Sequence, residues 1–198
     1  MRLVWGGALV LAAALAAGQP AAAAAAGEAR GRGSGRSGRP AARDARGDED
    51  DRLERAIEAA DRAGVDGRDI RDLQDLCRRG RFAEEQSLRI FSLAAQLALE
   101  GLPVESFAAK VGEGVSKRID PDRIVEVAER RALMLNRARS ILNDIVLEGA
   151  PVHDRDELIP DVAQALEAGS TEGKVRLELQ EAFTEGESMG AIRQRIFP

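Results

Sequence analysis

The chain has 198 residues, which suits one domain of ordinary size with a short appendage and leaves no room for two substantial cores. Hydrophobic residues make up 44% of the chain and aromatic residues only 3%, so aliphatic side chains must build the core. The only cysteine is Cys77 and the only histidine is His153, which argues against the usual zinc and copper sites, since these need several such ligands at fixed spacing.

The first segment, residues 1–26, has the pattern of a cleaved signal peptide. Arg2 supplies a positive charge, and the uncharged apolar run from Leu3 to Ala17 is shorter than the about 20 residues that span a membrane. Small residues offer a cleavage site near residues 24–26, and a retained anchor is the alternative. We therefore expect a periplasmic or secreted protein with no stable membrane anchor after cleavage.

Residues 27–47 consist mainly of Gly, Ser, Ala and Arg, a composition that predicts a disordered linker. This segment has six arginines and two acidic residues, whereas the chain from Asp48 onward has 22 basic and 32 acidic residues. The arginines could attract anionic lipid, cell-wall polymer or nucleic acid, or the segment could be a solvated spacer. We favour the spacer and expect no nucleic-acid partner, because no aromatic residue is interleaved for base stacking.

Residues 48–198 predict an all-α domain, an irregular antiparallel bundle of seven or eight helices. The third helix is apolar almost all round and should be central, while Pro160 should delay the start of the sixth helix or cost it a hydrogen bond. Glycines mark the helix ends, at Gly64, Gly80, Gly101, Gly149, Gly169 and Gly186. The expected helices span 48–62, 67–79, 83–100, 103–115, 121–148, 156–168, 172–184 and 188–197.

Two turns have nearly the same sequence, with Leu-Glu-Gly-Leu-Pro-Val at 99–104 and Leu-Glu-Gly-Ala-Pro-Val at 147–152. They indicate either duplicated helix-turn-helix units or one turn solution used twice. Between them, residues 110–117 read Lys-Val-Gly-Glu-Gly-Val-Ser-Lys. With the Gly-Leu-Pro turn, this stretch resembles a group of small exported all-helical bacterial proteins of unknown activity. The resemblance covers roughly residues 97–142 and implies the fold and export, but no functional residue.

No residue pattern in the sequence predicts a catalytic, cofactor-binding or metal-binding site. His153 should be a solvated or capping residue, and Cys77 should be a buried small hydrophobic side chain. We therefore expect a non-enzymatic protein that acts through a protein partner in the cell envelope, with its oligomeric state open. The alternatives are a carrier of a small apolar ligand and an enzyme with an unrecognised carboxylate site. Grooves between helices near Phe91, Phe107 and Phe183 are where a partner or an apolar ligand would bind, although each phenylalanine is itself expected to be a core residue.

Overall fold

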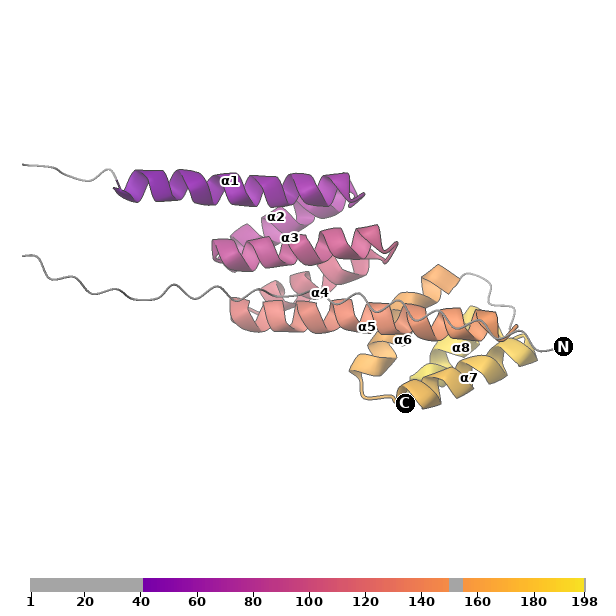
Figure 1. The fold of residues 1–198 in the computed structure, drawn as a ribbon. Coiled ribbons are helices and arrows are strands. Elements are labelled where there is room, and N and C mark those ends of the chain that lie inside the picture. Colours follow the sequence, from indigo (N-terminus) through magenta and orange to yellow (C-terminus); the bar gives the residue numbers. More distant parts are fainter. Residues whose placement is uncertain (1–40, 150–154, 198) are drawn as a thin grey trace, which may run out of the picture. The chain divides into compact units, whose positions relative to one another are not determined.

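The computed structural model describes residues 41–149 and 155–197, with side chains from residue 51 onward. The predicted leader, residues 27–40 of the linker and His153 lie outside the described residues. The described residues form helices and no strand, which confirms the all-α prediction (Figure 1). The eight helices are α1 (Ala41–Arg62), α2 (Gly67–Gly80), α3 (Glu84–Leu99), α4 (Val104–Ser116), α5 (Pro121–Leu147), α6 (Arg155–Glu167), α7 (Glu172–Glu185) and α8 (Met189–Ile196).

Helix α1 begins at Ala41, seven residues before the expected start at Asp48. Composition assigns residues 41–47 to the linker, yet the structure includes them in the helix. The reason is that alanine and arginine are strong helix formers, and the one glycine among these residues, Gly47, costs a helix only about 1 kcal/mol. A helix that is already held by packing farther along can therefore extend through them.

The odd-numbered helices form one row in which each helix packs against the next, α1 on α3, α3 on α5 and α5 on α7 (Figure 1). Arg89 near the start of α3 pairs with Glu129 of α5, and Glu100 at the end of α3 pairs with Arg139 farther along α5. Neighbours in the row are therefore parallel. Helix α2 packs on α4, and α6 on α8, in the returning direction. Consecutive helices thus form stacked antiparallel hairpins.

Helices α3 and α5 share the centre of the domain, because each of them packs against four other helices. The core is aliphatic apart from a few rings, and Phe107 and Phe183 are buried in it, 0% and 8% exposed. Leu99 departs from the expected central helix, since it is 75% exposed in the last turn of α3. Helix α6 runs through Pro160 instead of starting after it.

The glycine prediction is confirmed at five helix ends, where Gly64, Gly101, Gly149, Gly169 and Gly186 have positive φ angles. Helix α2 also ends at Gly80 as predicted, but the left-handed residue there is the next one, Arg81, with φ 54°. Gly80 is needed for a different reason, because a Cβ atom there would clash with the Phe82 ring. The turn after α4 also has a left-handed arginine, since Arg118, two residues after the last helical residue Ser116, has φ 56°.

Candidate binding grooves

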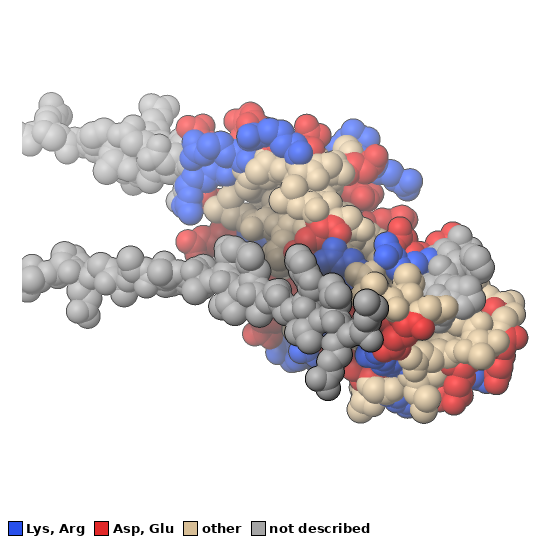
Figure 2. Space-filling model, turned by 45° about the vertical axis from the view of Figure 1, so that its right-hand side comes forward, with Lys and Arg blue, Asp and Glu red and all other residues tan. Residues whose placement is uncertain are grey.

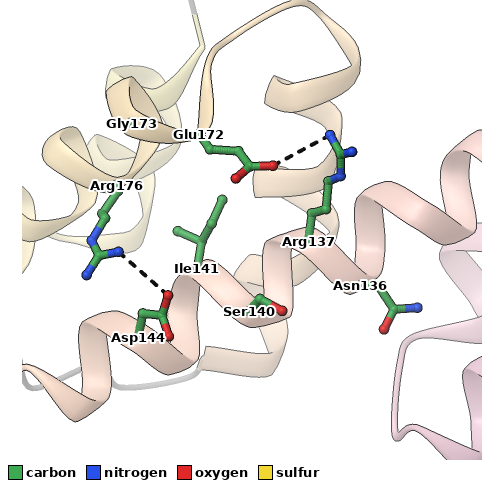
Figure 3. A pocket seen from close by; sticks show the side chains of 8 residues that line it. All are labelled: Asn136, Arg137, Ser140, Ile141, Asp144, Glu172, Gly173 and Arg176. Atoms are coloured by element: carbon green, nitrogen blue, oxygen red, sulfur yellow. Dashed lines mark ion pairs between the residues drawn. The ribbon is translucent and has the colours of Figure 1, made fainter. Parts of the chain in front are cut away.

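A polar groove of about 390 Å³ lies between α5 and α7 (Figure 3). Two ion pairs cross it, Arg137 to Glu172 at 3.5 Å and Arg176 to Asp144 at 3.6 Å. Each helix contributes one cation and one anion, so the groove presents both signs of charge along its length. The lining residues are Asn136, Arg137, Ser140, Ile141, Asp144, Glu172, Gly173 and Arg176.

Two exposed leucines follow the groove residues along α5 and α7. Leu147 lies one turn beyond Asp144 on the same face of α5, and Leu177 lies one turn beyond Gly173 on α7. Leu147 is 84% exposed and Leu177 55% exposed. We call the groove residues together with these two leucines the α5–α7 surface. Exposed aliphatic side chains next to arginines are a composition typical of protein interfaces.

The charges on the rest of the surface are mixed in sign. On the face drawn in Figure 2, basic and acidic side chains alternate over the helices, and uncharged areas lie between them. Several of these charges form ion pairs between neighbouring helices, such as Arg52 with Glu84 and Arg193 with Asp161. Exposed pairs of this kind contribute little stability each, typically below about 1 kcal/mol.

The Lys-x-x-Glu-Gly-x-x-Lys stretch lies on α4 and has a structural explanation. Glu113 accepts hydrogen bonds from Lys110, at 3.0 Å, and from Lys117. The Lys117 hydrogen bond, followed by that of Lys110, lowers the pKa of Glu113 to about 2. Gly114 faces α5, where a Cβ atom would lie only 2.8 Å from Ile124. The stretch therefore stabilises α4 and lets it approach α5 closely.

The buried cation Arg131 is a feature that sequence analysis missed. Its side chain is 8% exposed, on α5 beneath a groove between α4 and α6. It donates to the Ser106 hydroxyl at 2.5 Å and to the Pro160 carbonyl at 3.3 Å, and it lies 3.5 Å from Glu167. The sequence pattern that could have revealed this site is an arginine within the apolar stripe of α5, because an arginine that faces inward must find hydrogen-bond partners in the core.

An apolar groove of about 430 Å³ lies among α1, α2 and α3. Cys77 and Phe91 form its floor and are 7% and 1% exposed. Burial raises the pKa of the Cys77 thiol to about 11, in opposition to a hydrogen bond with Ser87. The thiol is therefore protonated at neutral pH, and the prediction that Cys77 is a buried small hydrophobic residue is confirmed.

An acidic groove lies between α2 and α4, with Asp69, Asp72 and Asp75 on one side and Glu105 on the other. Burial raises the pKa of Asp69, and the neighbouring carboxylates, Asp66 first, raise it further. Desolvation and like charges both disfavour the ionised form, so this carboxylate is destabilising in the folded state at neutral pH.

Comparisons of the chain with models of protein families, with curated proteins and with solved structures found no match. In the part of the chain that the structure describes, none of the helices has the length and apolar character needed to cross a membrane. Within residues 41–149 and 155–197, no three or more His, Cys, Asp or Glu side chains are grouped to hold a metal ion.

Proposed function

We propose that this chain is an exported, non-enzymatic helical protein that acts by binding another protein in the cell envelope. The observation that supports this proposal most is the α5–α7 surface, in which exposed Leu147 and Leu177 adjoin a groove with two arginines. Stacked helical hairpins are well suited to such a role, because neighbouring helices present extended surfaces to a partner.

The two leucines supply enough free energy to matter for binding. Burying a leucine completely contributes about 1.5 to 3 kcal/mol, so covering Leu147 and Leu177 from their present exposure would contribute about 2 to 4 kcal/mol. The paired charges of the groove would fix orientation more than affinity, since each cation already has an anion beside it.

Export agrees with the environment of Cys77 as well as with the leader pattern at residues 1–26. An exposed unpaired thiol is a liability in an oxidising compartment, where it forms disulfides with other chains. A buried thiol with a pKa of about 11 reacts slowly with oxidants and disulfides. The chain can therefore keep one free cysteine outside the cytosol.

Site-specific photocrosslinking in the bacterium that makes the protein tests this proposal. A photoreactive residue replaces Leu147 or Leu177 in the full chain, and the exposed Arg71 on α2 serves as the control position. We expect an adduct with a second protein from both leucine positions but not from Arg71, in the envelope fraction. Equal amounts of adduct from all three positions, or no adduct from the leucine positions, would contradict binding of a partner protein at the α5–α7 surface. Retention in the cytosol would contradict export.

The apolar groove of α1, α2 and α3 supports a second candidate, a carrier of a small apolar ligand. Its volume and its apolar floor with a few polar side chains at the rim are typical of ligand sites. A saturated fatty acid of ten carbons should then raise the thermal midpoint of the full chain, and Ile57→Asn at the wall should abolish the increase. An unchanged midpoint with the wild-type chain would reject the carrier.

A further inference from the structure

The groove between α4 and α6 contains charges that cancel. It has a volume of about 230 Å³, and Arg131 of α5 forms its floor. Lys110 at the rim is already hydrogen-bonded to Glu113, which leaves Arg131 and Glu167 as the charged pair inside. The lining residues are Ser106, Ala109, Lys110, Glu113, Arg131, Gln164 and Glu167.

Arg131 and Glu167 each keep an unused hydrogen-bonding atom. A guanidinium has five N–H donors, and Arg131 uses Nη2 for Ser106 and Pro160. Its Nε atom is buried and has no hydrogen-bond partner among the described residues, and the same holds for Oε1 of Glu167. The Nη1 atom lies 3.5 Å from that oxygen, too far for a good hydrogen bond. The guanidinium of Arg131 and the carboxylate of Glu167 therefore lie close together, and each keeps a buried atom that is costly to leave unpaired.

The chemistry of this pair selects its ligand. A carboxylate would pair with Arg131 but would be repelled by Glu167, and an ammonium group would have the opposite difficulty. An amide has no net charge, and it offers a carbonyl oxygen to the guanidinium and an N–H group to the carboxylate at the same time. The Ser106 hydroxyl and the Gln164 side-chain amide offer further hydrogen bonds at the same groove.

We propose that the α4–α6 groove binds an amide group of the partner protein between Arg131 and Glu167, an inference that rests on the proposed function. The two unused atoms are covered by protein, so the Glu167 side chain must rotate when the amide enters. Its position at the last residue of α6 and its exposure of 16% allow that rotation. The amide comes either from a glutamine or asparagine side chain or from the peptide backbone.

NMR spectroscopy of the ¹⁵N-labelled full chain can follow the Nε–H signal of Arg131 directly. The probes are capped tripeptides, acetyl-Gly-X-Gly-amide with X as Gln, Gly, Glu or Lys, at up to about 10 mM, which covers weak single-contact affinities. We expect the Gln peptide to shift this signal in a saturable manner. A shift by the Gln peptide alone identifies a side-chain amide, and equal shifts by the Gln and Gly peptides identify the backbone.

The variant Glu167→Gln removes the charged acceptor and keeps the shape of the side chain, so the affinity for the Gln peptide should fall about tenfold or more. Glu58→Gln, at an exposed glutamate of α1 that pairs with Arg62, is the matched control and should leave that affinity unchanged. A stronger shift with the Glu or Lys peptide, no shift with any peptide, or equal affinity in Glu167→Gln would overturn the amide site. If the amide site fails in this way but photocrosslinking from Leu147 still yields the adduct with a second protein, the proposed function stands without the amide site.

Discussion

Replacing Gly114 with alanine should destabilise the domain, although alanine is the better helix former. A Cβ atom at this position would lie 2.8 Å from one carbon of Ile124 and 3.2 and 3.3 Å from two others. Ile124 is a buried residue of α5, 3% exposed, so it cannot turn away without disturbing its neighbours. Overpacking of this kind costs about 1 to 3 kcal/mol, whereas the gain in helix propensity is at most about 1 kcal/mol. With the full propensity gain subtracted, the net loss is up to about 2 kcal/mol.

Gly112 provides a matched control two residues earlier in the same helix. A Cβ atom there would meet the methyl groups of Leu76 at 3.5 and 3.6 Å, which is ordinary van der Waals contact. Gly112→Ala should therefore gain about 0.5 to 1 kcal/mol from helix propensity. Both substitutions restrict the unfolded chain equally, so the comparison isolates the contact in the folded state.

Urea unfolding of the two full-length variants, followed by circular dichroism at 222 nm, measures the difference. The midpoint should fall for Gly114→Ala and rise for Gly112→Ala, and the thermal midpoint should change by about 2 to 4 °C per kcal/mol. If Gly114→Ala proves as stable as Gly112→Ala, then α4 and α5 do not meet at Gly114 as described.

Three further predictions concern charges. The pKa of Glu113 is lowered from 4.5 to about 2, so its stabilisation is present above pH 4.5 and is lost toward pH 2. The thermal midpoint of Glu113→Gln should consequently vary less with pH than that of the wild type between about pH 2 and 4.5. The difference between the two proteins should be small, because the carboxylate is exposed. Parallel pH profiles of the two midpoints would contradict this prediction. Because the pKa of Asp69 is raised, Asp69→Asn should increase the midpoint at pH 7 but not at pH 3, and a lower midpoint at pH 7 would refute it. Arg195→Met leaves four carboxylates near this position without their shared cation, so hydrogen exchange of the α8 amides should become faster. Added salt should slow the exchange again, because it screens the repulsion between the carboxylates. Unchanged exchange would show that α8 does not depend on these ion pairs.

Most helix boundaries were predictable because the residues that set them act locally. Asp120 accepts a hydrogen bond from the N–H of Asp122 at 3.0 Å, with Pro121 in the first turn, as expected of an N-cap. Left-handed glycines end the helices in the same local way. The glycine rule does not give the conformation of the turn after α2, where Gly80 stays helical and Arg81 takes the left-handed conformation. A Cβ atom at Gly80 would clash with the Phe82 ring and would lie 3.1 Å from Val115 of α4, a contact that the sequence does not reveal.

The grooves could not be predicted, because each depends on residues far apart in the sequence. Helical periodicity identifies the face of α5 that is buried, but it does not say which helices cover that face. Arg131 meets a carbonyl 29 residues later and a hydroxyl 25 residues earlier, and no spacing rule links such positions. The pairing of Arg176 with Asp144 and Glu148, which joins α7 to α5, is of the same kind.

The two similar turns have a common structural role that goes beyond ending a helix. In each turn the glutamate of the Leu-Glu-Gly sequence pairs with an arginine of the next helix in the row, Glu100 with Arg139 of α5 and Glu148 with Arg176 of α7. A turn solution used twice would need only the glycine with its positive φ angle. Both pairs join parallel neighbours of the same row, so the Leu-Glu-Gly turn ties the row together at two places. The arginine follows its glutamate by 39 residues in the first pair and by 28 in the second, so the two pairs do not occupy equivalent positions of a repeat.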